Sequence, residues 1–207
     1  VLFRSDPDIA QSITLQGQDL IKFSIKAVNF YFKERWHLDS ELHAVMGISD
    51  FKINKVEDDA AIYTDTDSIY IQFGSALKSV EGLNLTPDEY LKMCIQIDEH
   101  RLAAYFDQCF NKWSRLYNTE NRQTFKLELI AENGFWIKKK NYALKISYEP
   151  NPTNSLYSKE DRYLMIKGLE PIKSSYPEWA RNHQLKFIDY LLKKGDKVDL
   201  EGELIPM

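Results

Sequence analysis

The chain has 207 residues, of which 43% are hydrophobic and 28% are charged, a balance typical of a globular protein with a substantial core. No apolar run approaches the roughly 20 residues of a membrane-spanning helix, and the four histidines show no zinc-type spacing with the two cysteines. The formal net charge of −4 argues mildly against nucleic-acid binding, but lysines gather locally in the second half of the chain, and local distribution matters more than the sum.

The first 36 residues divide into a short leader and a helical pattern. Residues 1–5 read VLFRS, which matches a translated sequencing-adapter end, so we interpret them as an assembly artefact. Between residues 6 and 36 apolar side chains recur mostly at spacings of three and four, which predicts an amphipathic helix of about 25 residues. We assign its apolar stripe to the core and give it no chemistry: Ile9, Ile13, Leu20, Ile21, Ile25, Val28 and Phe32.

The sequence YTDTDSIYI, Tyr63 to Ile71, places two aspartates one residue apart between two β-prone runs. Side chains alternate along a strand, so Asp65 and Asp67 can point the same way out of a hairpin tip. Paired carboxylates suit Mg²⁺, which takes one or two protein carboxylates together with substrate phosphates. The alternative is an ordinary solvated turn, because Asp and Ser are common turn residues.

A second long helix is predicted from Pro87 to about Trp113. It contains Cys94 and Cys109, whose separation along a helix would be roughly 22 Å. The two cysteines therefore cannot bridge each other, and we expect buried thiols in a reducing compartment.

Strands are predicted near 125–130 and 136–148, and the second contains three consecutive lysines, Lys138, Lys139 and Lys140. Their natural partner is a phosphate backbone, although a solvated edge strand carrying lysines is the open alternative. Glu128 lies on the first of these strands and is either a further carboxylate near a metal or an exposed strand residue. The order of elements predicts an α+β fold with helices packed behind an antiparallel sheet.

Three motifs resemble family B DNA polymerases. The family's Tyr-Gly-Asp-Thr-Asp-Ser motif is matched except at Thr64, which replaces Gly, and its Lys-Lys-x-Tyr motif is matched by Lys139, Lys140 and Tyr142. The segment from Tyr163 to Arg181 is similar to the start of the family's thumb, with matching positions at Lys167, Gly168, Glu170 and Lys173. Two other family motifs, Asp-x-x-Ser-Leu-Tyr-Pro and Lys-x-x-x-Asn-Ser-x-Tyr-Gly, are absent from the 207 residues.

The resemblance implies a polymerase palm with the beginning of a helical thumb. Residues 6–36 would lead from the fingers into the palm, residues 37–148 would form the palm with the catalytic hairpin, and residues 149–207 would start the thumb. It further implies template-directed transfer of nucleotides from dNTPs to a primer 3′-OH in tailed-phage or viral DNA replication, in the bacterial host cytoplasm. The chain itself is expected to be a fragment that is inactive alone.

The resemblance also assigns residue roles. Asp67 would be the main ligand and Asp65 the second ligand of two Mg²⁺ ions, one or both of which need an aspartate outside this chain. The primer-template DNA would contact Lys138, Lys139, Lys140, Tyr142, Lys167 and Lys173, while supporting roles fall to Tyr63, Thr64, Thr66, Ser68 and Glu128. Other expected partners are dNTPs, an N-terminal polymerase portion and a sliding clamp, with no membrane.

Two other classes of function remain open. The chain could be a non-catalytic DNA-binding half of a split polymerase, or an acidic hairpin domain that binds Ca²⁺ or a protein. The polymerase and split-polymerase hypotheses both predict an affinity for primer-template DNA that weakens steeply with added salt, whereas a domain that binds Ca²⁺ or a protein would show no such affinity.

Overall fold

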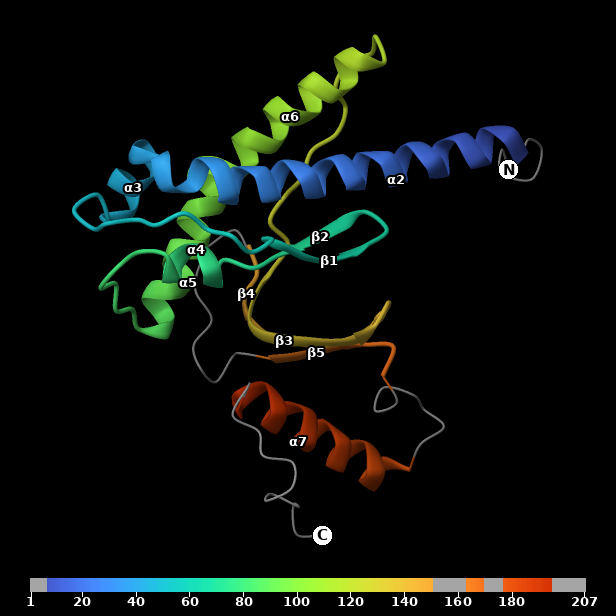
Figure 1. Ribbon diagram of the computed structural model, residues 1–207. Coiled ribbons are helices and arrows are strands. Elements are labelled where there is room, and N and C mark those ends of the chain that lie inside the picture. Colours follow the sequence, from blue (N-terminus) through green and yellow to red (C-terminus); the bar gives the residue numbers. More distant parts are fainter. Residues whose placement is uncertain (1–6, 151–162, 170–176, 195–207) are drawn as a thin grey trace. The chain divides into compact units, whose positions relative to one another are not determined.

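The computed structural model describes residues 7–150, 163–169 and 177–194, and the chain divides into two compact units, Val1–Lys126 and Leu127–Met207 (Figure 1). The predicted α+β class and the antiparallel pairing are confirmed. The prediction of one sheet is wrong for the described residues. These form a two-stranded sheet, β1-β2, and a separate three-stranded sheet, β3-β4-β5, so the acidic and the basic motif lie in different sheets.

The first unit begins with the long helix α2, Pro7–Phe30, which continues into a π-helical segment Tyr31–Arg35 and a 3₁₀ turn Trp36–Leu38. The predicted helix is confirmed, but its apolar stripe is core only toward its C-terminal end, where Val28 is fully buried. Ile9 and Ile13 are 45% and 52% exposed, because the described residues of this unit pack only against the later turns of α2. Their assignment to the core is therefore wrong in this structure.

The second predicted helix is confirmed as one continuous helical run with a π-helical interruption. It consists of α5, Pro87–Ile97, the π segment Asp98–Leu102, and α6, Ala103–Leu116. A capping box between Thr86 and Glu89 starts α5. α6 crosses α2, and the hydroxyl of Tyr105 donates a hydrogen bond of 3.0 Å to the carbonyl of Ala27 (Figure 1). Both cysteines in this run are free and buried, as predicted.

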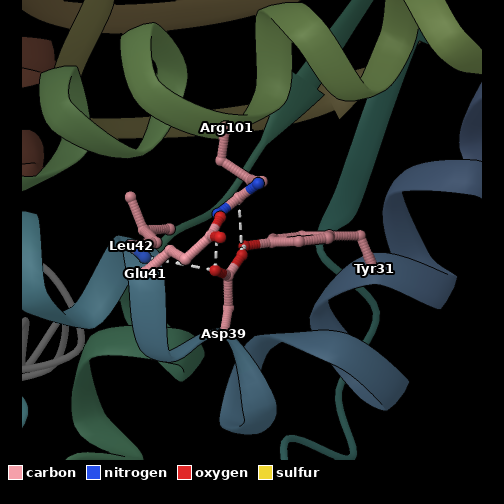
Figure 2. Close-up of polar contacts among 5 residues, drawn as sticks. All are labelled: Tyr31, Asp39, Glu41, Leu42 and Arg101. Atoms are coloured by element: carbon pink, nitrogen blue, oxygen red, sulfur yellow. Dashed lines mark hydrogen bonds and ion pairs between the residues drawn. The ribbon is translucent and has the colours of Figure 1, made fainter.

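A polar cluster around Asp39 connects these helical runs (Figure 2). Asp39 caps α3, Ser40–Met46, by accepting a hydrogen bond of 3.1 Å from the amide of Leu42. The Tyr31 hydroxyl donates to the same carboxylate at 2.7 Å, and the Arg101 guanidinium contacts both of its oxygens at 2.6 Å. Tyr31 and Arg101 each lie in a π-helical segment, so both interruptions supply a partner to one partly buried carboxylate.

Aromatic side chains fill much of the core of the first unit, and one of them, Phe125, fixes the course of the chain just before β3 begins. Phe125 packs edge-on against Phe106 and Phe110, with ring centroids 5.1 Å away in both cases. The predicted strand at 125–130 is therefore wrong for nearly all of its length, because Phe125 is held against α6 and regular strand structure begins only at Ile130.

The second unit contains β3, Ile130–Lys138, β4, Asn141–Tyr148, β5, Tyr163–Lys167, and the helix α7, Glu178–Lys194. β4 is the central strand and is mostly buried. A core of Ala143, Leu169, Ile188 and Leu192 joins the sheet to α7, and Lys145 on β4 makes an ion pair of 2.7 Å with Asp189 on α7. The segment from Tyr163 to Arg181, which resembles the start of the thumb, contains β5 and the first residues of α7, and its residues 170–176 lie outside the described ranges.

Candidate functional site

The acidic motif forms a tight hairpin in the first unit, as predicted. β1, Ala61–Asp65, pairs with β2, Ser68–Ile71, and Thr66 and Asp67 form the two-residue turn. Asp65 ends its strand opposite Ser68, whose hydroxyl donates a hydrogen bond of 3.0 Å to the Asp65 carbonyl. The Asp67 amide donates to the same carbonyl at 2.6 Å. These two hydrogen bonds fix the backbone of the turn that carries both aspartates.

The residues around the two aspartates stabilise this turn. The rings of Tyr63 and Tyr70 are cross-strand neighbours with centroids 5.3 Å apart, an edge-on contact of the kind that contributes about 0.5–1 kcal/mol to a hairpin. Thr64 lies inside β1 opposite Ile69. Thr66 adopts a left-handed backbone conformation, with φ of 53°, which is costly for a β-branched residue. Its hydroxyl donates to the Asp65 carboxylate at 3.3 Å.

The chemistry available at this tip is that of two carboxylates at neighbouring positions. Asp67 is exposed and Asp65 is half-buried. Hard oxygen donors fit Mg²⁺, so Asp65 and Asp67 are the residues that would hold it. Within the described ranges no group of three or more His, Cys, Asp or Glu side chains is placed to hold a metal ion. A cation at this tip would therefore take its remaining ligands from water, from substrate phosphates or from another carboxylate.

The three lysines lie at a hairpin tip in the second unit, so their predicted place inside a strand is confirmed for Lys138 and wrong for Lys139 and Lys140. Lys138 ends β3, Lys139 and Lys140 form the turn, and Asn141 begins β4. All three lysines are exposed. Lys140 adopts a left-handed conformation with φ of 63°, which closes the chain reversal, and the Asn141 side-chain amide donates to the Lys139 carbonyl at 3.1 Å.

The thumb-like motif lies next to this turn. β5 pairs with β4 so that Lys167 stands opposite Tyr142, and Gly168 follows directly. Lys167 is exposed, whereas Tyr142 is only 4% exposed and packs beside Trp136 with ring centroids 6.3 Å apart. The second unit thus brings together Lys138, Lys139, Lys140, Tyr142 and Lys167, whereas Lys173 lies outside the described residues.

Glu128 does not lie on a strand. It is exposed in the irregular segment that precedes β3, because the chain at Phe125 packs on α6 instead of entering a sheet. Two residues of the basic site were not identified as contacts from the sequence, Trp136 beneath the turn and Gly168 beside it. An aromatic residue six positions before the motif tyrosine and a lone glycine after a strand are the only signals, and neither is specific.

No protein-family model matches the chain, and the search of curated proteins gives no match. Within the described ranges, no helix combines the length and the apolar character needed to cross a membrane.

Proposed function

We propose that this chain supplies part of the palm and the start of the thumb of a family B DNA-directed DNA polymerase. The observation that carries the proposal is the hairpin whose tip holds Asp65 and Asp67 in the motif Tyr-Thr-Asp-Thr-Asp-Ser. A solvated acidic turn needs neither a matching tyrosine pair nor a second motif of the same family downstream. The basic hairpin at Lys139 and Lys140 is that second motif.

In this proposal the two aspartates bind metal and the basic hairpin binds DNA. Asp67, which is exposed, is the main ligand, and Asp65 orients the cation or shares it. Two Mg²⁺ ions, when bound, lower the barrier to nucleotidyl transfer by stabilising the charge on the attacking and leaving oxygens. A further aspartate comes from outside these 207 residues, since the family motif that carries it is absent from them.

The basic hairpin would hold the primer-template duplex. Lys139, Lys140 and Lys167 are exposed side chains that can contact phosphates, which position a duplex without reading its sequence. Tyr142 is buried under the turn, so in this proposal its ring supports the lysines and does not stack on a base.

A non-catalytic DNA-binding half of a split polymerase is the second candidate. It is favoured by the basic hairpin, whose exposed lysines can bind a phosphate backbone without any metal. Like the first candidate it predicts DNA binding, but unlike the first it predicts no catalytic metal at Asp65 and Asp67.

The metal is tested by titrating Mn²⁺, a paramagnetic substitute for Mg²⁺, into the ¹⁵N-labelled chain. We expect selective broadening of the amide signals of residues 64–68, and its loss in the double variant Asp65→Asn, Asp67→Asn. The matched control is Asp58→Asn, Asp59→Asn, which removes the same charge from the segment before the hairpin. If the control variant loses the broadening as fully as the Asp65, Asp67 variant does, the metal does not bind specifically at the tip. The non-catalytic candidate would then remain.

DNA binding is tested by fluorescence anisotropy with a primer-template duplex at several salt concentrations. The double variant Lys139→Gln, Lys140→Gln should weaken binding and reduce the slope of log affinity against log salt by about two units, one per lost phosphate contact. The control Lys92→Gln, Lys112→Gln removes the same charge from exposed positions of α5 and α6. If both variants weaken binding equally, the basic hairpin is not a specific contact and only the overall charge of the chain matters. If the wild-type chain does not bind DNA, both DNA-binding candidates are overturned.

A further inference from the structure

Two turns of the second unit meet backbone to backbone. Lys140 closes the β3-β4 turn, and Gly168 follows β5, the strand that pairs with β4. A Cβ atom placed on Gly168 would lie 2.2 Å from the carbonyl oxygen of Lys140 and 3.2 Å from the side-chain carbonyl carbon and oxygen of Asn141. Gly168 also has a φ of 66°, which favours glycine.

The nature of the nearest atom makes this contact different from those of the other described glycines. At Gly134 an added Cβ would lie 2.5 Å from a methyl carbon of Leu144, the far end of a flexible side chain that can move. At Gly82, with φ of 78°, it would meet nothing within 4 Å. At Gly168 it would meet a backbone carbonyl in a turn, so relief of the clash requires the turn itself to move.

The Lys140 conformation depends on such surroundings. A lysine with φ of 63° is in a sparsely populated region, and such residues persist where neighbouring structure holds them. Two contacts do so here: the Asn141 side-chain amide bonds to the Lys139 carbonyl, and the bare backbone of Gly168 lies against the Lys140 carbonyl.

Resting on the function proposed above, we infer that Gly168 is a positioning residue that holds the Lys139-Lys140 turn beside Lys167, so that three exposed lysines form one site for a phosphodiester backbone. Gly168 itself offers no side chain to the DNA. Its contribution is the close approach of β5 to the turn, which sets where the ammonium groups stand relative to one another.

The inference predicts that moving the lysines weakens DNA binding even when no lysine charge is removed. Gly168→Ala removes no charge, yet it should move the turn and weaken primer-template binding about tenfold or more, with a smaller salt slope because fewer phosphate contacts form together. Gly82→Ala is the matched control, because it introduces the same unfavourable φ without a contact. Gly168→Asn adds a second control: asparagine tolerates the left-handed region but still carries a Cβ.

The experiment combines amide chemical shifts with anisotropy on the full chain. We expect Gly168→Ala and Gly168→Asn both to shift the amides of residues 139–142 and to weaken DNA binding, while Gly82→Ala does neither. Unchanged amide shifts in Gly168→Ala would overturn the inference, because the turn would not have moved. Recovery of affinity in Gly168→Asn, or an equal loss in Gly82→Ala, would also overturn it, because backbone strain and not the contact would then be responsible.

Two further outcomes are distinguishable. If the wild-type chain binds no DNA, the proposed function and the phosphate site both fail, although the shifts still show whether Gly168 sets the turn. If Gly168→Ala does not fold, Asn141→Ala tests the same turn from its other side without adding a clash. It should weaken binding about threefold, roughly the loss of half a log unit in affinity, and an unchanged affinity would overturn the inference.

Discussion

Backbone strain in the described part of the chain is concentrated in the two candidate turns. The non-glycine residues with positive φ there are Thr66, Asn118 and Lys140. Asn118 follows the end of α6, a usual place for this conformation. Thr66 and Lys140 lie at the tips of the acidic and basic hairpins, and neither residue type favours the left-handed region. Residues in this sparsely populated region persist only where the surrounding structure, here a two-residue hairpin turn, holds them.

His43 is a titratable residue whose burial should make stability depend on pH. It lies on α3, is 5% exposed, and packs edge-on against Trp36 with ring centroids 5.2 Å apart. Burial lowers the pKa of His43 below the ordinary value of 6.5, and nearby His37 lowers it further, against the opposing effects of Asp39 and the Trp36 backbone.

The sign of the pH effect follows from this direction. Below pH 6.5 the unfolded chain binds a proton at His43 that the folded chain does not, so acidification favours unfolding by up to about 1.4 kcal/mol per pH unit within the shifted range. Urea unfolding at pH 7.5 and pH 5.5 should show a larger loss for wild type than for His43→Gln. Equal losses in the two proteins would mean that His43 is not the group responsible.

At the scale of elements, Asp39 connects two neighbouring helical segments, Tyr31–Arg35 and α3, to a third that lies about 60 residues further along the chain, Asp98–Leu102. Its side chain is 11% exposed, and its partners come from the segment after α2, from α3 and from the segment before α6 (Figure 2). Burial, followed by the hydrogen bond to Asp39, raises the pKa of Tyr31, so its hydroxyl stays protonated and donates at any physiological pH.

Asp39→Ala should lower the free energy of unfolding by about 2–4 kcal/mol, because it removes a helix cap and leaves Arg101 without its main partner. The matched control is Glu41→Ala, since Glu41 contacts the same guanidinium at 3.2 Å but its side chain is 86% exposed. That variant should change stability by less than about 1 kcal/mol. Denaturant unfolding measures both, and similar losses would show that the partly buried Asp39 contributes no more to stability than the exposed Glu41.

At the scale of the whole molecule, the division into two units predicts that the first can fold alone. Its core and its polar cluster are built from residues before 127, and Phe125 seals its end against α6.

A chain of residues 1–126 should therefore retain the amide shifts that residues 7–120 have in the full chain. Phe125→Ala in the shortened chain should cost about 2–4 kcal/mol, because a large ring leaves an aromatic cluster. Shifts that change throughout residues 7–120 on shortening would show that the first unit depends on the second.

The sequence by itself determined the elements whose signal is local. The periodic helices and the hairpin at Asp65 and Asp67 follow from side-chain periodicity and turn chemistry, which act over a few residues. The chemical character of the candidate site is local as well, because two carboxylates one residue apart and a run of lysines are visible without a fold.

Only the tertiary structure decided the rest, because it depends on which distant surfaces meet. Phe125 packs on α6 and so ends the predicted strand that would have carried Glu128. A bulge between Trp136 and Lys138 and the left-handed Lys140 turn the lysine run into a hairpin tip, where strand propensity predicted a continuous strand. The contact of Gly168 with the Lys140 carbonyl joins residues 28 positions apart, and that separation is closed by the pairing of β4 with β5, which no local pattern encodes.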